Sequence, residues 1–528
     1  MLTKNRLNFA TAALLASSAL IPTSMGAATV ESLGTIDFPN SGAPEAQEAF
    51  VRGVLLLHSF EYDDAKEAFL EAQAIDPEFD LAYWGEAMTY NHPLWRQQDR
   101  EAANSVLAKL SDPAPTPREQ GYIDALVILY GDGDKVGRDY AYSEAMRQLS
   151  EKYPEDLEAR SFHALSILGT TQGVRDFRAY MRAGAVAEEV FAVNPRHPGA
   201  VHYLIHSYDD PVHAPLGLRA ARVYAEIAPA ASHAQHMISH IYVAMGRWAD
   251  SVESNIQSFE VSRARATRKG LGVDDLNFHA FHWLQYSYLQ LGQWHKALEM
   301  LKQIHEYAVE SGSMRARGYY AAMRASWLVE TGDTGIPPSL GVENTGATSA
   351  AADLFASGYR VLTSGDKNGA ITALGQLEDL LADLSAASSD SVAAERRHVI
   401  EVLTLSLRAQ IALAEDRNLE ARELLAEATT IEDAMPLEYG PPSIVKPSNE
   451  LFGEVLLKSA EPTEAAVQFD RALERAPRRR ASLWGLAQAT AASGDTPILE
   501  ASCGELASIL VKADPRVGFP AVCEMPSR

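Results

Sequence analysis

The feature that most constrains this 528-residue chain is a set of five residues that occurs twice at identical spacing. In each set, a glycine is followed after twelve, sixteen, nineteen and twenty-four residues by Ala, Phe, Ala and Pro. Small residues let two antiparallel helices approach closely, the aromatic ring fills the space between hairpins, and proline ends the second helix. The pattern therefore predicts stacked helix hairpins. The two sets are Gly53, Ala65, Phe69, Ala72 and Pro77, and Gly453, Ala465, Phe469, Ala472 and Pro477.

These residues resemble the tetratricopeptide repeat (TPR), a helix-turn-helix unit of about 34 residues. Weaker copies lie between the two sets, at 198–229, at 279–300, and from Ser232 with a turn at Gly246. Alanine is abundant and runs of β-branched residues are few, which favours helix. We expect an all-α fold, a right-handed α-solenoid of stacked TPR-like hairpins.

Three segments interrupt the repeats. Residues 331–350 are rich in Gly, Thr and Ser, and we expect a loop or break there. It would separate an N-terminal TPR-like array at 29–330, which holds a histidine-rich groove, from a C-terminal array at 351–528. Residues 439–447 contain three prolines and are interpreted as a stiff loop, with folding across the groove as the alternative. Residues 111–117 are Pro-rich and are read as a loop.

The first residues, 1–28, are predicted to be a secretory signal peptide. Lys4 and Arg6 form a basic start, an apolar stretch covers 9–21, and small residues allow cleavage near Ala28. The apolar stretch is too short to span a membrane, and no later stretch is long enough. We therefore expect a periplasmic or secreted protein with no integral membrane segment.

The net charge restricts the kinds of molecule that the protein can bind, and the two cysteines bear on whether it contains a disulfide. The net charge of −24 argues against nucleic acid, since phosphate binding needs a basic face. A short basic run at 478–480 is interpreted as a solvated helix start. The only two cysteines, Cys503 and Cys523, either pair in an oxidising compartment or remain free thiols, and both alternatives stay open.

The histidines are strongly clustered, because nine of the fifteen fall within 197–282. His202 and His206 are four residues apart, as are His236 and His240, and the second pair follows the first by 34 residues. Imidazoles four apart share one face of a helix. In the next unit, His279 and His282 stand at the places of His233 and His236. The same face therefore carries histidine in three consecutive units. If the TPR resemblance holds, that face lines the concave groove.

Imidazole is the commonest nitrogen ligand for transition metals. A pair of histidines four residues apart can chelate one ion, and a third ligand from the next helix completes a site with an open position. We predict a transition-metal site, with zinc, copper or iron as the candidates and with enough ligands for two ions. The candidate ligands are His202, His206, His233, His236, His240, His279, His282, Asp209 and Asp210, and His58 and His92 form a second candidate groove pair.

Two other interpretations of the histidines remain. The imidazoles could hydrogen-bond a peptide or protein ligand in the groove without metal, or they could pack as structural residues. The signatures His-Glu-x-x-His and Gly-x-Ser-x-Gly and phosphate-binding loops are absent from the sequence, so neither the presence nor the absence of enzymatic activity is predicted.

Three segments, 91–95, 197–206 and 232–242, resemble a poorly characterised group of exported bacterial TPR-containing proteins. The resemblance implies the fold and supplies no catalytic residues, since TPR arrays serve mainly as binding scaffolds. The leading hypothesis is an exported TPR solenoid whose groove binds a transition metal, with a catalytic role for that metal left open. The competing hypothesis is a periplasmic scaffold for a peptide or protein.

Overall fold

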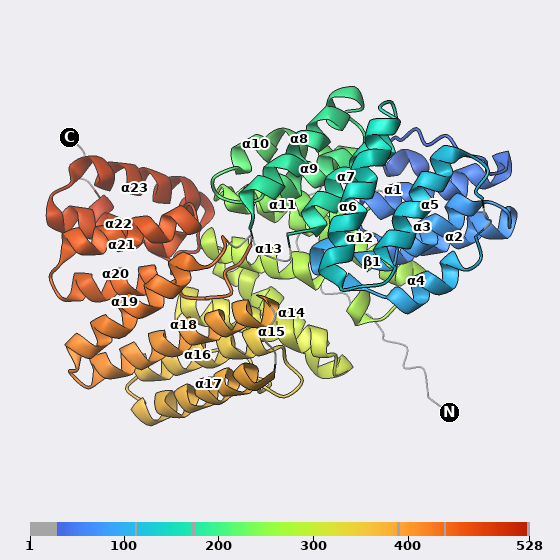
Figure 1. Cartoon of the computed structure of the whole chain (residues 1–528). Coiled ribbons are helices and arrows are strands. Elements are labelled where there is room, and N and C mark those ends of the chain that lie inside the picture. Colours follow the sequence, from blue (N-terminus) through green and yellow to red (C-terminus); the bar gives the residue numbers. More distant parts are fainter. Residues whose placement is uncertain (1–28, 111–112, 172–174, 388–390, 438–439, 525–528) are drawn as a thin grey trace.

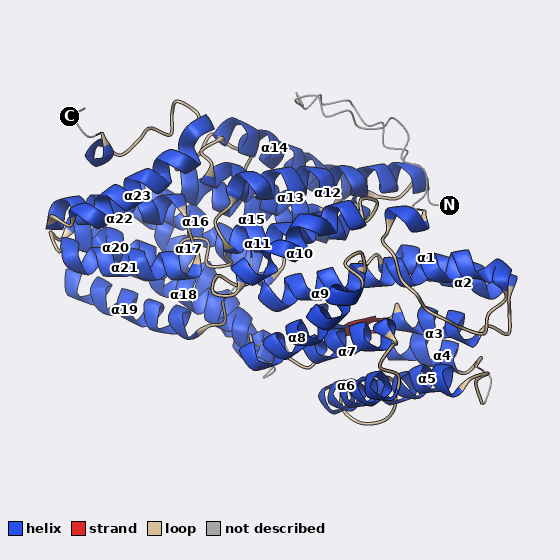
Figure 2. Cartoon of the chain, turned by 90° about the horizontal axis from the view of Figure 1, so that it is seen from above, coloured by secondary structure: helices blue, strands red, loops and turns tan. Residues whose placement is uncertain are grey.

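The computed structural model describes residues 29–110, 113–171, 175–387, 391–437 and 440–524. Within these ranges the chain forms 23 α-helices, a few short 3-10 turns and one two-stranded β-sheet, so the predicted all-α solenoid is confirmed. Consecutive helices pack as hairpins along the stack, and almost every ordered element in Figure 2 is helical. None of the described helices is long and apolar enough to cross a membrane. The predicted signal peptide lies outside the described residues.

The first half of the chain forms the right-hand and upper parts of the molecule in Figure 1. A small antiparallel sheet interrupts it, in which β1 (Asn91–His92) pairs with β2 (Gln97–Gln98). The helices are α1 Gln47–His58, α2 Tyr62–Ile75, α3 Asp80–Met88, α4 Arg100–Leu107, α5 Pro117–Leu129, α6 Lys135–Lys152, α7 Leu157–Gly169, α8 Phe177–Val193, α9 Pro198–Tyr208, α10 Ala214–Ile227, α11 Ser232–Ala244 and α12 Trp248–Lys269.

The second half continues the stack below and then to the left in Figure 1. The segment 331–350 lies between α15 and α16, and these two helices pack on each other, so the stack continues across this loop. The helices are α13 Phe278–Gln290, α14 Trp294–Ser311, α15 Met314–Thr331, α16 Ala347–Thr363, α17 Lys367–Ala387, α18 Ser391–Ala414, α19 Asn418–Ala434, α20 Ser448–Lys458, α21 Pro462–Arg475, α22 Arg480–Ser493 and α23 Thr496–Ile509.

The five-residue set has the structural role that the sequence predicts. Phe69 of α2 is fully buried and lies between Gly53 of α1 and Gly85 of α3. A Cβ atom would lie 2.7 Å from the ring at Gly53 and 2.3 Å from it at Gly85. Only glycine therefore allows the three helices to close around this ring, and the same arrangement recurs around Phe469.

The stack closes back on its own middle. The C-terminal helices lie beside α11 and α13, where Leu483 and Trp248 belong to one shared apolar cluster. The indole Nε1 of Trp248 donates to the carbonyl oxygen of Arg478 at 3.0 Å. Arg479 is fully buried and donates to the hydroxyl of Tyr286 at 2.7 Å. The prediction that 478–480 starts a helix is confirmed, because α22 begins at Arg480. The prediction that this run is solvated is wrong, because Arg479 and Arg480 are buried and the run joins two distant parts of the stack.

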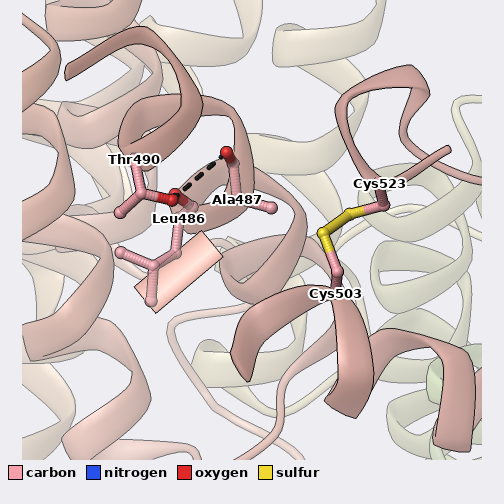
Figure 3. Close-up of a disulfide and its surroundings, with 5 residues drawn as sticks. All are labelled: Leu486, Ala487, Thr490, Cys503 and Cys523. Atoms are coloured by element: carbon pink, nitrogen blue, oxygen red, sulfur yellow. Dashed lines mark hydrogen bonds between the residues drawn. A yellow bond between two sulfur atoms is a disulfide. The ribbon is translucent and has the colours of Figure 1, made fainter. Parts of the chain in front are cut away.

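Cys503 and Cys523 form a disulfide with their Cα atoms 5.4 Å apart (Figure 3). The bond joins α23 to a short 3-10 turn at Ala521–Cys523 across a separation of 20 residues. Of the two alternatives left by the sequence, the structure therefore has the paired one. A link of this length restricts the unfolded chain and stabilises the fold by about 3 kcal/mol.

Replacing Gly485 by alanine should destabilise the fold by about 1–3 kcal/mol through overpacking. The new Cβ atom would lie 2.2 Å from the ring of Phe469. Gly504 of α23 is the matched control, because nothing lies within 4 Å of a Cβ atom there. Gly504→Ala should stabilise the fold by about 0.5–1 kcal/mol through helix propensity. Urea unfolding followed by circular dichroism measures both, and a Gly485→Ala variant as stable as the wild type would contradict the packing role.

Candidate metal centre

The first helices of three consecutive hairpins, α9, α11 and α13, carry the clustered histidines. Caps fix where two of these helices begin. The Nδ1 atom of His197 accepts from the Ala200 N–H ahead of α9, and the Asn277 side chain accepts from the Ala280 N–H ahead of α13. These starts set the helical register, so the histidine-bearing faces of the three helices meet.

Six of the seven predicted histidines form two groups of three. Within each group, one nitrogen of every ring lies within 4.8 Å of one nitrogen of the other two. The Nε2 atoms of His202 and His233 are 3.2 Å apart in the first group, and those of His236 and His240 are 3.1 Å apart in the second. The first group is His202, His206 and His233, and the second is His236, His240 and His279.

The second group repeats the first at the next hairpin. Each consists of a pair four residues apart on one helix and a third histidine from the first helix of the next hairpin. The third members, His233 and His279, both stand thirteen residues before a turn glycine, Gly246 and Gly292. At the same place in α9 stands Gly199, where a Cβ atom would lie 2.4 Å from the ring of a neighbouring histidine. The histidines of the two groups thus occupy equivalent positions in successive repeats.

One carboxylate joins the two groups. The Oδ2 atom of Asp209 lies 3.4 Å from Nδ1 of His206 and 3.0 Å from Nδ1 of His240. The centroids of these two rings are 5.6 Å apart. Burial alone would raise the pKa of Asp209, but Arg175 and the two rings hold it well below its usual range. Asp209 is therefore ionised and accepts a hydrogen from both rings.

Two further hydrogen-bond acceptors determine which ring nitrogen carries the hydrogen in His202 and in His236. The Nδ1 atom of His202 lies 2.6 Å from the carbonyl oxygen of His58, which can only accept. The Nδ1 atom of His236 lies 2.7 Å from Oδ1 of Asn255, whose Nδ2 donates to the carbonyl of Ser251. Nδ1 is the donor in both rings, as it is in the two that face Asp209. The Nε2 atoms of all four rings are then left with lone pairs.

In the second group this assignment brings two lone pairs face to face at 3.1 Å. Two neutral acceptors repel, and a proton or a metal ion between them would remove this repulsion. Burial opposes the proton: desolvation, followed by the charges of His279 and His240, lowers the pKa of His236 well below its usual value. Desolvation also lowers the pKa of His279 to about 3. Metal-bound histidines commonly donate their other nitrogen to a carboxylate or carbonyl, as these rings do.

Aromatic side chains enclose both groups. Trp283 stacks on His240 with ring centroids 4.5 Å apart and meets His236 edge-on at 4.9 Å. Phe60, in the turn between α1 and α2, packs against His202 at 4.3 Å and against His233 at 5.5 Å. The turn residue Phe60 has φ 54°, a left-handed conformation that aims its ring at the histidines. The groove face predicted from sequence is thus buried under other parts of the solenoid.

Two predicted ligands lie outside both groups. Asp210 accepts from Arg175 at 2.8 Å and lies 2.9 Å from Nδ1 of His213, so its carboxylate faces away from the rings. His282 of α13 has a buried Nε2 atom with no hydrogen-bond partner among the described residues. It belongs instead to the wall of a neighbouring cavity.

The second candidate pair is not brought together in one site. Both ring nitrogens of His58 are engaged, Nδ1 with the Tyr203 hydroxyl at 2.8 Å and Nε2 with Glu158 at 2.6 Å. His92 lies in β1, where its ring stacks on Tyr62 at 3.9 Å and its Nε2 donates to a backbone carbonyl at 3.1 Å. Only His58 contacts the histidine groups, through its own carbonyl oxygen.

Sequence reasoning missed Glu158, which lies at the start of α7 and is fully buried. Its carboxylate accepts from Nε2 of His58 at 2.6 Å and from Nε2 of His197 at 2.9 Å. Since the carbonyl of His58 in turn accepts from His202, this network ties α1 and α7 to the first histidine group. Glu158 has no partner nearby in the sequence, so no local motif could have revealed it.

A cavity of about 350 Å³ lies beside the histidines. It touches one member of each group, His206 and His279. Part of its wall is formed by Pro436, Leu437, Pro441 and Ser443. Gly440, at φ 103°, lies so close to Trp283 that a Cβ atom would be 2.3 Å from the indole. The loop predicted at 439–447 therefore folds across the groove, although Tyr439 itself lies outside the described residues.

No family model matches the chain, and no curated protein matches it in sequence. Solved structures that resemble it include the APC/C hetero-tetramer Cut9–Hcn1 (TM-score 0.33, 11% identity, 92% of this chain and 77% of that chain). Human IFIT1 with m7Gppp-AAAA has TM-score 0.35 and 13% identity, covering 90% and 87%, and yeast Tom70 has 0.32 and 12%, covering 87% and 92%. We draw nothing about function from TM-scores this low, and the assignment of the repeats rests on the hairpins themselves.

Replacing Glu158 by glutamine should lower the free energy of unfolding at pH 7 by about 3 kcal/mol, because it breaks a buried ion-pair network. Burial alone would raise the pKa of Glu158, but His197 and His58 lower it from 4.5 to about 2. A lowered carboxyl pKa stabilises the fold above the unfolded value and loses this effect as pH falls toward the folded one. The deficit of the variant should therefore shrink as pH falls from about 4.5 toward 2.

Glu151→Gln is the control for this measurement. Its side chain is 63% exposed and pairs with Arg147 on the surface of α6. Exposed pairs of this kind contribute about 0–1 kcal/mol. Urea unfolding at a series of pH values compares the three proteins. Equal losses in the two variants, or a Glu158→Gln deficit that does not change with pH, would count against the network.

Proposed function

We propose that this protein binds two transition-metal ions, one in each histidine group. The observation that carries the proposal is the set of outer hydrogen bonds, which leave Nε2 lone pairs in four rings of the two groups. Histidines that only pack or hydrogen-bond a ligand need no such uniform arrangement. Desolvation around the rings further disfavours protonation, so the nitrogens are available to a metal at neutral pH.

The donor set favours copper. Among the described residues, each of the two groups consists of imidazoles alone. Copper(II) binds nitrogen sites most tightly among the divalent first-row metals. Non-haem iron commonly takes two histidines and one carboxylate, a set that His206, Asp209 and His240 would supply in place of the two groups. Asp209 supplies its carboxylate to the Nδ1 side of the rings, where it orients them. Zinc, which three histidines also hold, is the second choice.

Three protein ligands leave an open coordination position on each ion. The adjoining cavity touches both groups, so a small molecule in it could reach either position. This arrangement supports a site that presents metal to a ligand, in contrast to a structural site with a full set of protein ligands.

We further propose that the protein is exported, with residues 1–28 as the cleaved signal peptide. The disulfide between Cys503 and Cys523 supports this proposal, since such bonds persist in oxidising compartments and are rare in the cytosol. Export would also place the histidine groups where the metal supply differs from that of the cytosol.

Metal content tests the proposed function. Protein purified without a histidine tag, stripped with chelator and reloaded with Cu(II) or Zn(II), should hold two ions per chain, one for each group. His202→Ala and His236→Ala should each retain one ion, and the double variant none. Mass spectrometry of the metal and far-UV circular dichroism give the content and the helicity.

His295→Ala is the matched control, because this side chain is 57% exposed and pairs with Asp514 far from both groups. It should retain both ions. A folded wild-type protein that takes up neither copper, zinc nor iron would contradict the proposal and favour the metal-free scaffold. A single ion that either variant removes completely would contradict the assignment of two sites.

Asp209→Asn should weaken metal binding about 10–100-fold, because an outer partner that orients the ligand rings is lost. Asp210→Asn is a close control: this carboxylate also pairs with Arg175 but contacts neither group. Competition against a chelator of known affinity measures both variants. Equal effects of the two substitutions would mean that Asp209 acts only through Arg175.

A further inference from the structure

The cavity beside the histidines is assembled from four separate parts of the chain. Its walls come from the segment around β1 and β2, from α7 and α8, from the histidine face of α9 and α13, and from α18 with the loop after α19. Its volume of about 350 Å³ falls in the range of pockets that hold small molecules, about 300–1,000 Å³. Four distant segments that meet around one space of this size point to a ligand pocket.

One part of the wall is apolar and aromatic, and the rest is polar. Leu94, Leu168 and Leu437 come from three different parts of the chain, and Tyr180 and Trp283 add two aromatic side chains. Trp283 is buried against the second histidine group, so its ring is fixed in place. Walls of this kind favour a ligand with a flat apolar body over a strongly hydrated one.

The charged side chains of the wall balance one another. Arg175 is paired with Asp209 and Asp210. Glu395 of α18 lies in the field of Arg96, which opposes the rise in the Glu395 pKa that burial causes. In the metal-free protein, with two cations and two anions in the wall, the pocket has no excess charge to attract an anion or a cation. Its ligand is therefore expected to be uncharged.

Three wall residues have a buried polar atom without a hydrogen-bond partner among the described residues, namely Arg175, His206 and His282. Arg175 is paired with Asp209 and Asp210 through its other nitrogens, and His206 belongs to the first histidine group, which leaves His282 for the ligand.

The Nε2 atom of His282 is buried and has no hydrogen-bond partner among the residues that the structure describes. The repeat explains why: His282 stands where the two groups have His202 and His236, but the place of the next histidine is taken by Tyr286. The hydroxyl of Tyr286 accepts from Arg479 at 2.7 Å, so no third group forms.

A buried, unpaired imidazole nitrogen costs free energy unless a ligand bonds it. Burial lowers the pKa of His282 to about 4, so the ring is uncharged at neutral pH and can exchange a hydrogen bond with a hydroxyl. His282 also lies one helical turn after His279, a member of the second group. A hydroxyl bonded to His282 would thus be near that group.

We infer that this cavity binds a small uncharged phenol, with its ring between the apolar walls and its hydroxyl bonded to His282. The inference deepens the proposed function, because the pocket gains its chemical role from metal ions in the adjoining groups. Binding of the phenol itself needs no metal. The two proposals can therefore fail separately.

Four one-ring probes test the inference on the stripped, full-length protein: phenol, toluene, benzoate and benzylamine. Titration calorimetry or ligand-observed NMR measures their affinities. Phenol should bind most tightly, since toluene lacks the hydroxyl and the other two carry charge. His282→Phe should weaken phenol binding about five- to tenfold, the effect of one hydrogen bond, and leave toluene binding unchanged.

His163→Phe is the matched control. It is also a buried histidine with a pKa lowered by burial to about 4, and it lines a different cavity, of about 290 Å³. This variant should bind phenol like the wild type. His282→Gln, which keeps a hydrogen-bonding group, should recover part of the lost affinity and checks the case in which the phenylalanine disturbs the fold.

Three results would overturn the inference: no binding of phenol, tighter binding of benzoate or benzylamine, or equal phenol affinity in wild type and folded His282→Phe. Because the wild-type series needs no variant, it decides the question even if a substitution unfolds the protein. Phenol binding without metal uptake would contradict the proposed function and leave this inference standing. Metal uptake without phenol binding would contradict this inference and leave the proposed function standing.

Discussion

The arrangement of the centre depends on one interaction, the hydrogen bonds that the Asp209 carboxylate accepts from His206 and His240. A carboxylate held between two rings from different helices fixes both tautomers at once and joins the two groups. It can do so only while ionised, and Arg175 keeps it ionised in a buried place. Without Asp209, either ring could place its hydrogen on Nε2, and the lone pairs that a metal needs would be lost.

Closure of the solenoid strengthens the hydrogen bonds that Asp209 accepts, because it buries them. TPR-like stacks are expected to leave an open inner face, but here Phe60 covers the histidines from one side and Gly440 brings a distant loop against Trp283 from the other. The buried contact of Arg479 with Tyr286 holds the C-terminal helices in place for that closure. Removing water from around the rings lowers their basicity and strengthens every charged contact among them.

The sequence was sufficient for the helix hairpins and for most of the histidine register, because both follow from spacing along single helices. It could not reveal Glu158 or Asn255, whose partners come from other helices and carry no repeat signature. It also gave the wrong exposure for the basic run at 478–480, since a charged run is expected to be solvated until its buried partners are known. Local periodicity determines which side chains share a face, whereas closure of the stack determines what covers that face.

The repeat also explains the number of groups. A metal group needs a histidine pair from one hairpin and a third ring from the next, so three hairpins supply two groups when the third contributes only His279. In that third hairpin Tyr286 replaces the second histidine of a pair and bonds Arg479. The residue that ends the series is thus also one that anchors the closing C-terminal helices. His282, left without a hydrogen-bond partner among the described residues by the same replacement, is where the repeat changes from forming a histidine group to facing the cavity.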